Sequence, residues 1–275
     1  MPTGDPTTCA MRPCIVVTGG SRGIGFALAK QFAATGHDIL LIARGSEDLE
    51  HAAKLLRLNH PALGIHTLAL DITSLDAVGA IEQALLSRDL FCNILINNAA
   101  AGLSGPFYSQ SSAEISALLN TNILALTRLT HAALAGMRAR GKGAIINIAS
   151  LGAYVPGPHQ AVYYASKAYV VSLSEALSAE LSGSGIHVMA ILPGPVPTSF
   201  HKDMAADRAL YRFLIPQTSP DKVARSAYRA FLIRRRVVVP GIMNQLFALA
   251  IRLAPHFVSI PLMAWLLKNP DPDHN

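Results

Sequence analysis

Residues 14–25 read Cys-Ile-Val-Val-Thr-Gly-Gly-Ser-Arg-Gly-Ile-Gly. The first five form a short apolar run, which is typical of a buried strand, and residues 24–34 have helical character. Glycines between the two segments let the backbone turn tightly and approach a phosphate group. The helix offers its first N–H groups and the positive end of its dipole to the same phosphate. A glycine-rich loop at this junction therefore predicts a dinucleotide-binding βαβ unit.

Strand-like runs alternate with helical segments along most of the chain. The strand-like runs are continuously apolar and fall at residues 14–18, 38–43, 65–70, 93–97, 143–149, 185–192 and 236–239. The helical segments fall at residues 24–34, 47–59, 75–87, 112–140, 161–182 and 221–232. Continuously apolar strands are expected when helices cover both faces of a parallel sheet. We therefore predict an α/β fold with a doubly wound, Rossmann-type parallel sheet, whose ligands bind at the carboxyl ends of the strands.

Changes in composition divide the chain into three parts. Residues 1–13 are polar and rich in Pro and Thr, which predicts a flexible N-terminal tail and not a signal peptide. Residues 14–240 contain no linker, which predicts a single Rossmann-type catalytic domain. Residues 241–275 are mostly apolar and predict a helical C-terminal extension.

The C-terminal extension has three interpretations. Between Val237 and Leu267 the only charged side chain is Arg252. Proline residues divide this stretch into segments shorter than the ~20 apolar residues that span a bilayer, so we expect no transmembrane helix. The segments could be helices packed on a substrate pocket, a subunit interface, or an anchor that lies in a membrane surface.

Composition excludes several functions. The three cysteines, Cys9, Cys14 and Cys92, show neither a disulfide framework nor a paired metal spacing, and the ten histidines form no His-x-x-x-His pair. We therefore predict no metal site and a reducing, cytoplasmic compartment.

The formal charge of the chain is +6, but its one dense basic run is residues 234–236, without the aromatic-lined stripe expected of a nucleic-acid site. This charge also suits an anionic small ligand.

The end of the second predicted strand bears on the choice of cofactor. Sites that prefer NAD often place an acid there, but this strand ends in Ala43-Arg44. Arg44 and Arg22 could bind a 2′-phosphate through charge-assisted hydrogen bonds, which favours NADP(H) over NAD(H). Asp71 ends the third strand and either bonds the adenine amino group or caps the following helix. The glycine loop contributes the remaining expected cofactor contacts: Thr18, Gly19, Ser21, Arg22, Gly23, Ile24 and Gly25.

The segment Tyr163-Tyr164-Ala-Ser-Lys167 carries the predicted chemistry. Tyr163 and Lys167 are four residues apart and share one face of a helix. A nearby cation favours the phenolate, so we expect Lys167 to lower the pKa of Tyr163 from its ordinary value near ~10. Ser150 could hold a substrate oxygen beside the phenol, which gives general acid–base chemistry at a carbonyl or alcohol. Tyr164 is the rival phenol, but its spacing to Lys167 and Ser150 is less suitable.

Together these motifs resemble the single-domain short-chain dehydrogenases/reductases. They occur in the order and spacing of that family between about residues 14 and 240: Thr18-Gly-Gly-Ser-Arg-Gly-Ile-Gly25, Asp71, Asn97-Asn98-Ala99-Ala100, Asn122, Ser150, Tyr163-x-x-x-Lys167 and Pro193-Gly194-Pro195-Val196-x-Thr198. Two departures are Ala100, where the family usually has glycine, and Ala149, where a second serine is common.

The resemblance implies a role for each catalytic residue. Tyr163 is the general acid or base, and Ser150 positions the substrate oxygen. Lys167 lowers the pKa of the phenol and bonds the nicotinamide ribose, so Tyr163 and Lys167 both contact the cofactor. Asn122 holds a water chain that relays protons to Lys167.

The resemblance also implies further cofactor contacts. Pro193, Thr198 and the backbone near Val196 resemble contacts to the nicotinamide end. Asn98 resembles a scaffold residue of the cofactor pocket. The family further suggests a homodimer or homotetramer.

Residues 199–220 follow these contacts and predict a lid over the substrate. The segment mixes apolar side chains with three cations, namely Phe200, Met204, Leu210, Tyr211, Phe213 and Leu214 with Lys202, Arg208 and Arg212. An apolar substrate suits this mixture, although the same residues could simply pack the lid onto the domain.

The sequence thus predicts an NADP(H)-dependent oxidoreductase that interconverts a carbonyl and a secondary alcohol on a small-molecule substrate. A 3-oxoacyl-thioester reductase is a narrower alternative. A nicotinamide-sensing protein without turnover is a different class, against which the retained catalytic set argues. Peripheral membrane contact through the C-terminal extension stays open at this point.

Overall fold

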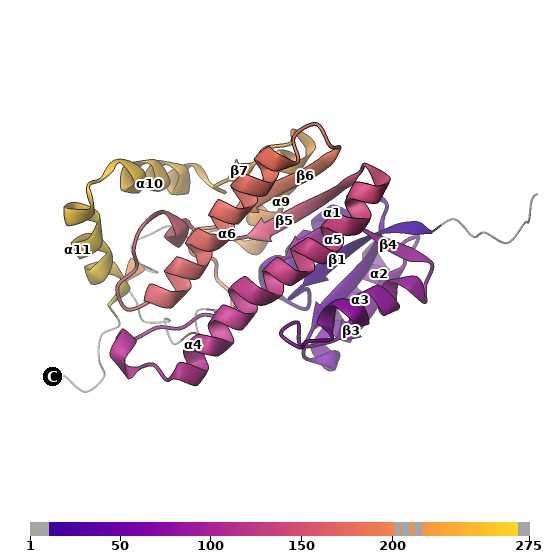
Figure 1. Ribbon diagram of the computed structural model, residues 1–275, viewed down its shortest axis with the longest axis horizontal. Helices are drawn as coiled ribbons and strands as arrows, with labels where there is room; N and C mark the ends of the chain where they lie inside the picture. Colours follow the sequence, from indigo (N-terminus) through magenta and orange to yellow (C-terminus); the bar gives the residue numbers. More distant parts are fainter. Residues whose placement is uncertain (1–10, 201–203, 205–209, 212–216, 269–275) are drawn as a thin grey trace, which may run out of the picture.

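The computed structural model describes residues 11–200, 204, 210–211 and 217–268. Its centre is a seven-stranded parallel sheet with the strand order β3-β2-β1-β4-β5-β6-β7 (Figure 1). The strands are β1 (Arg12–Thr18), β2 (Asp38–Ala43), β3 (Ile65–Ala69), β4 (Leu90–Asn97), β5 (Gly143–Ile148), β6 (Ile186–Ile191) and β7 (Val237–Val238). The predicted Rossmann-type fold is therefore confirmed, and the strand order reverses between β1 and β4, where ligands of such sheets bind.

Helices cover both faces of the sheet, which is why the strands are apolar on both sides. The helices are α1 (Gly23–Phe32), α2 (Ser46–Asn59), α3 (Ala77–Leu86), α4 (Ser112–Leu119), α5 (Leu126–Arg140), α6 (Ala161–Glu180), α9 (Pro220–Leu232), α10 (Ile242–Leu253) and α11 (His256–Leu267). One buried cluster joins the sheet to α1, α2 and α9, and another joins its opposite face to α3, α5 and α6.

Some boundaries differ from the sequence expectation. β1 begins at Arg12, inside the expected tail, because the strand pairs with β4 from that residue onward. Residues 1–10 of the expected tail lie outside the described residues. The long helix expected over residues 112–140 is interrupted by a π-helical segment, Asn120–Ala125. Such segments often occur at functional sites, and this one lies between α4 and α5.

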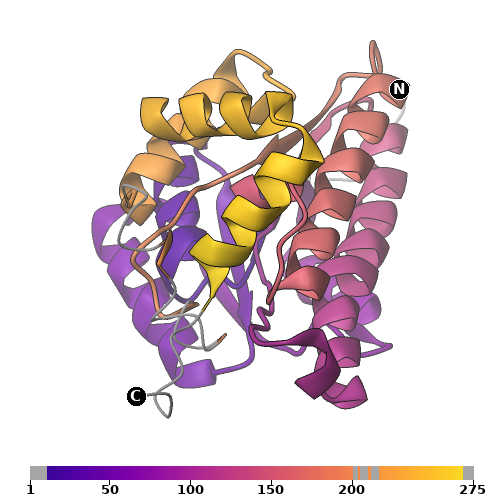
Figure 2. The same ribbon diagram turned by 90° about the vertical axis from the view of Figure 1, so that its left-hand side faces the viewer.

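The C-terminal helices pack against the carboxyl end of the sheet. α10 and α11 lie at one end of the molecule, beyond the start of α6 (Figures 1 and 2). Ile251 of α10 and Met263 of α11 are buried in a cluster with Val155, Tyr164 and Tyr211. Of the three interpretations of the extension, packing on the pocket is therefore found in the structure. No helix in the described part of the chain is long and apolar enough to cross a membrane.

Candidate active site

A cavity of about 980 Å³ lies at the carboxyl ends of the strands. The glycine loop and the ends of β2 and β3 line one part of it, and the ends of β4 and β5 line its middle. The start of α6 and residues of α10 and α11 close the other part. Within the described residues, no three His, Cys, Asp or Glu side chains are grouped to hold a metal ion.

The glycine loop leaves no room for larger side chains. A Cβ on Gly25 would lie 2.1 Å from the carbonyl oxygen of Gly19 and 2.4 Å from Nδ2 of Asn98. Gly23 has a φ of +57°, in the left-handed region that favours glycine, and a Cβ there would meet the Thr198 side chain at 3.2 Å. The backbone can therefore curl tightly around a bound phosphate, and the loop lies against Thr198.

Asn98 ties the end of β4 to this loop. Its Nδ2 donates to the carbonyl oxygens of Thr18 and Gly19 at 3.0 and 2.9 Å. The Thr18 hydroxyl oxygen in turn accepts from the backbone N–H groups of Asn98 and Ala99 at 3.0 and 3.1 Å. Asn98 lines the cavity, whereas Thr18 and Gly25 lie behind its wall. The structure thus places Thr18 and Gly25 as supports of the loop.

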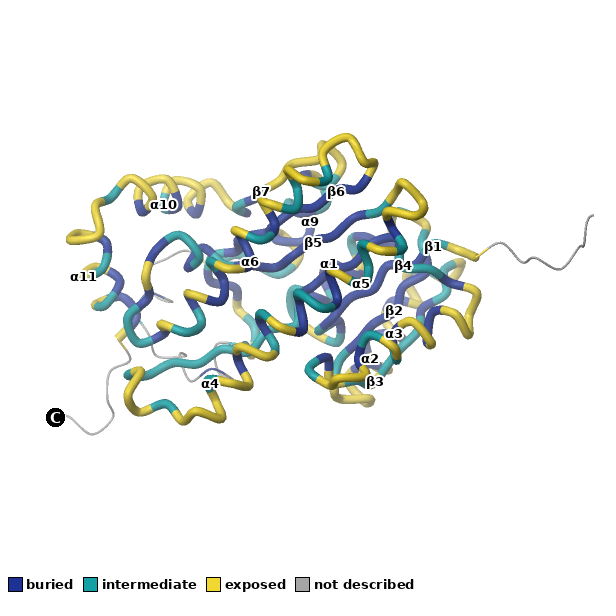
Figure 3. Tube along the Cα trace, viewed as in Figure 1, coloured by how far each residue is buried: buried dark blue, intermediate teal, exposed yellow. Residues whose placement is uncertain are grey.

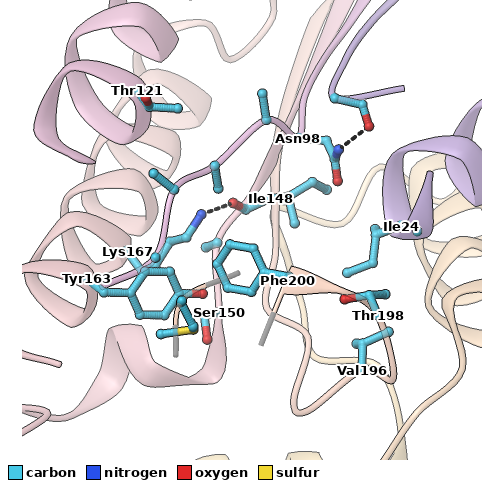
Figure 4. A pocket seen from close by; sticks show the side chains of 18 of the residues that line it. Ile24, Asn98, Thr121, Ile148, Ser150, Tyr163, Lys167, Val196, Thr198 and Phe200 are labelled. Carbon is cyan, nitrogen blue, oxygen red and sulfur yellow. Dashed lines mark hydrogen bonds between the residues drawn. The ribbon is translucent and has the colours of Figure 1, made fainter. Parts of the chain in front are cut away.

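The other residues expected to bind the cofactor do line the cavity. They are Gly19, Ser21, Arg22, Gly23, Ile24, Arg44, Asp71, Tyr163, Lys167, Pro193, Val196 and Thr198. Ala100, where the family usually has glycine, lines it as well. Figure 4 shows Ile24, Val196 and Thr198 grouped on one side of the pocket, opposite Lys167 and Tyr163.

Asp71 is held by its own turn. Its Oδ1 accepts from the Thr73 backbone N–H at 2.9 Å and from the Thr73 hydroxyl at 2.8 Å. These bonds, together with the positive charge of Arg44, hold the pKa of Asp71 below its ordinary value. Helix α3 begins at Ala77 with Asp76 at its N-cap, so Asp71 caps the turn before the helix and not the helix itself. The carboxylate lines the cavity, as an adenine contact requires.

Ser150, Tyr163 and Lys167 meet at the end of β5 (Figure 4). The Tyr163 phenol and the Ser150 side chain lie next to each other. Ser150 also accepts from the Gly152 N–H at 3.1 Å, which fixes the serine at the start of its loop. The Nζ of Lys167 donates to the Ile148 carbonyl oxygen at 3.0 Å. The three residues expected to carry the chemistry are therefore brought together.

The expected lowering of the phenol pKa is wrong for this structure. Burial raises the pKa of Tyr163 to about 12, and the adjacent Ser150 side chain offsets this only in part. Burial lowers the pKa of Lys167 to about 8. The ammonium does not lower the phenol pKa, because Nζ is directed to the Ile148 carbonyl and lies 5.7 Å from the centre of the Tyr163 ring.

Asn122 lies in the π-helical segment and is buried, with 1% of its surface exposed. Its Oδ1 accepts from the Ala101 N–H at 2.8 Å, and its Nδ2 donates to the Ala101 carbonyl and the Ser166 hydroxyl at 2.9 and 3.0 Å. The side chain thus joins the loop after β4 to α6. It does not line the cavity, whereas neighbouring Thr121 does, so a role of Asn122 in proton relay stays a prediction.

The part of the cavity around Tyr163 is apolar. We define the apolar end of the pocket as the six uncharged side chains that pack around Tyr163 and Gly102, namely Tyr164, Phe200, Met204, Tyr211, Phe247 and Met263. The Phe200 ring lies 5.7 Å from the Tyr163 ring, and a Cβ on Gly102 would clash with Met204 at 2.6 Å. Phe200 and Met204 of the expected lid therefore lie beside Tyr163 and Gly102; Lys202, Arg208, Arg212, Phe213 and Leu214 lie outside the described residues.

Many lining residues were not predicted from the sequence, and three of them have large side chains near Tyr163 or Tyr164. Phe247 and Met263 come from α10 and α11, and no local pattern indicates that these helices reach the pocket. Gln160 lies three residues before Tyr163, a helical spacing that could have indicated it. Its side chain is 2% exposed, and its Nε2 has no hydrogen-bond partner in the described structure. A buried amide without a partner beside a cavity suggests a contact to a ligand.

Comparisons with known proteins agree with this geometry. A family model described as short chain dehydrogenase matches residues 13–209. A sulfoacetaldehyde reductase from Chromohalobacter salexigens is 34% identical over 230 residues, which cover 81% of this chain and 89% of that protein. A short-chain dehydrogenase from Sphingobium yanoikuyae, solved with NADPH, is 34% identical with a TM-score of 0.77, over 86% of this chain and 92% of that one. The bulky-bulky ketone specific alcohol dehydrogenase from Comamonas testosteroni is 30% identical with a TM-score of 0.72, over 87% and 92% of the two chains. The protein therefore belongs to the short-chain dehydrogenase family of oxidoreductases, which act on carbonyl and alcohol groups.

Proposed function

We propose that the protein is an NADP(H)-dependent oxidoreductase that interconverts a carbonyl and a secondary alcohol on an apolar substrate. The observation that carries this proposal is the shared cavity. The adjacent side chains of Tyr163 and Ser150 line the same space as the glycine loop. A reacting carbonyl and a dinucleotide would therefore meet in one place.

The residues present fit NADP(H). The tight turn at Gly25 and the N-terminus of α1 suit a pyrophosphate. Arg22 and Arg44 line the same part of the cavity and suit a 2′-phosphate. The similar protein from Sphingobium yanoikuyae was solved with NADPH, which supports this choice. When bound, the cofactor would supply or accept a hydride.

The phenol would move the proton. With a pKa of about 12, Tyr163 is protonated at neutral pH, which is the state that a general acid needs for carbonyl reduction. Ser150 would hold the substrate oxygen beside the phenol and donate to it as negative charge develops. Acid catalysis is worth roughly 10²–10⁴-fold and a donor to a developing oxyanion roughly 10²–10³-fold. The protonated phenol is therefore in the state needed to donate a proton during carbonyl reduction.

The walls around Tyr163 suit a neutral, bulky substrate. The apolar end of the pocket offers aromatic and thioether groups and, among its described residues, no charge. A small sulfonated aldehyde, as the name of the relative from Chromohalobacter salexigens implies for that protein, would find no cation to pair with among the described residues of this end. The similarity to a bulky-bulky ketone specific enzyme agrees with an apolar ketone.

Gln160 favours a second candidate, a 3-oxoacyl-thioester reductase. Its amide could donate to an acceptor near the reacting carbonyl, and a 3-oxoacyl thioester carries one. A nicotinamide-sensing protein without turnover gains nothing from a phenol placed beside Ser150 in the cavity. The cytoplasmic location and the homodimer or homotetramer stay predictions.

The test is a set of substrates assayed by loss of NADPH absorbance. The set contains a bulky diaryl ketone, a long-chain 3-oxoacyl thioester and sulfoacetaldehyde. We expect the highest kcat/KM for one of the two apolar compounds. The highest value for sulfoacetaldehyde would contradict the apolar substrate, and no turnover with any carbonyl compound, together with tight NADPH binding, would favour the sensor.

A further inference from the structure

The outward side of the two C-terminal helices carries large apolar side chains in contact with solvent. We define the outer apolar face as nine residues: Ile242, Met243, Leu246, Leu249 and Leu253 of α10 and Phe257, Val258, Leu262 and Trp265 of α11. Their exposed fractions range from 41% for Leu262 to 81% for Phe257. Figure 3 shows exposed chain along α10, along the connection to α11 and on α11 itself. Apolar patches of this extent on a protein surface usually mark an interaction site.

The face is built on helices that are held in place. The spacing of the α10 residues puts them on one side of the helix, while Ala248 and Ile251 on the other side are buried. In α11, Met263 and Leu267 are buried against the pocket. The outer face therefore has a fixed shape, as a docking surface requires.

The small number of charged side chains on α10 and α11 favours a second copy of this chain over an anionic membrane surface as the partner. Helices that bind membrane surfaces are typically rich in Lys and Arg on their polar side. Between Ile242 and Leu267, Arg252 is the only charged residue, and its guanidinium lies over the Tyr154 ring at 4.7 Å. The face thus has little to attract anionic lipid. A second copy, in contrast, would meet a nearly uncharged surface, on which Arg252 is the only charged side chain of these two helices.

The outer apolar face has both a hollow and exposed aromatic side chains, and this combination suits self-association. A hollow of about 520 Å³ opens beside α10, with Tyr154, Leu249 and Leu253 in its wall. Phe257 and Trp265 of α11 are exposed by 81% and 55%. A two-fold interface pairs a patch with itself, so projections and a hollow must lie on one face. Interface anchors are typically aromatic side chains that fill such hollows.

We propose that two copies of this chain dock through their outer apolar faces. A standard interface buries ~800 Å² and about 20–30 residues on each partner, and the nine exposed side chains would form the apolar centre of such a contact. Because Phe247 and Met263 of the same helices line the cavity, the contact would also brace the roof of the pocket. The docking does not depend on which carbonyl compound the pocket accepts.

Trp265 makes the test direct, because it is the only tryptophan of the protein. In the assembled protein its ring would be buried, so its emission should shift to longer wavelength on dilution as the copies separate. Leu249→Glu and Phe257→Glu should halve the particle mass measured by sedimentation. Leu75→Glu is the matched control, since Leu75 is 84% exposed outside this face, and it should leave the mass unchanged.

Two results would overturn the proposed docking of two copies. An unchanged mass in both folded variants, with emission independent of dilution, would overturn it. Emission that shifts to shorter wavelength only on addition of phosphatidylcholine–phosphatidylserine vesicles would overturn it in favour of a bilayer partner. If a glutamate variant does not fold, the dilution series of the unaltered protein decides alone.

Discussion

The side-chain nitrogen of Lys167 lies 3.0 Å from the carbonyl oxygen of Ile148, the last residue of β5. This contact fixes α6 to the end of the sheet and so sets the position of Tyr163, one turn earlier on the helix. The amine is buried, with 3% of the residue surface exposed, and burial lowers its pKa to about 8.

The lowered pKa of Lys167 predicts a rise of stability with pH. Between about pH 8 and the ordinary pKa of 10.5, the unfolded chain keeps a proton that the folded protein releases, so the free energy of unfolding increases. The gain is at most about 3 kcal/mol, from the size of the shift. Urea unfolding from neutral pH to about pH 9, below the range in which the raised pKa values of the buried Cys14 and Cys92 thiols oppose the trend, should show this rise. Lys167→Met should flatten it and exposed Lys54→Met should not; an equal rise in both variants would contradict the assignment.

Tyr163→Phe should remove the general acid and leave the cofactor site intact. We expect kcat to fall by at least about 100-fold, while the Kd of NADPH, measured by fluorescence titration, changes by less than about twofold. Tyr164→Phe is the control and should keep most of the activity, because the Tyr164 ring packs against Gly152 and Gly157. A Tyr163→Phe enzyme with a tenth of the original rate would show that another group donates the proton.

Arg44→Ala should distinguish the two cofactors. Loss of a charge-assisted hydrogen bond to a 2′-phosphate costs roughly 1.5–3 kcal/mol, so the Kd of NADPH should rise about 10- to 100-fold. The Kd of NADH should hardly change. Exposed Lys30→Ala, outside the cavity, controls for the loss of general positive charge. Equal losses for both cofactors in the Arg44 variant would remove the 2′-phosphate contact.

Gln160→Leu should separate a ligand contact from a structural role. Replacing a buried amide without a partner by an apolar group should leave the free energy of unfolding unchanged or raise it. The kcat/KM for a 3-oxoacyl thioester should fall about tenfold, while that for a ketone with no second acceptor should stay within about twofold. A clear loss of stability with equal activity losses on both substrates would show that the amide is structural.

The sequence was sufficient for the fold and for the position of the reacting groups, because both depend on local patterns. Apolar runs of strand length set the sheet, and the spacing of Tyr163 and Lys167 follows from the helix that carries them. The protonation of these groups was not predictable in the same way. It depends on burial by Phe200 and on the direction of the lysine toward Ile148, and both arise from packing between distant segments.

The pocket walls were the least predictable part. Phe247 and Met263 lie about one hundred residues after Ser150 in the chain, and only the folded structure brings α10 and α11 over the cavity. Gln160 has a suitable helical position, but the lack of a partner for its amide is visible only in three dimensions. Sequence patterns report which face of an element is apolar, and they do not report what that face covers.

Because α10 and α11 form part of the pocket wall, the residues that would carry out the reaction and some of those that would select the substrate lie in different parts of the sequence. Every group that would handle the proton is encoded before residue 170, whereas part of the wall that meets the far end of a substrate is encoded after residue 240. Evolution, or an engineer exchanging the last segment between relatives, can therefore retune substrate preference in one step and leave the reaction machinery untouched.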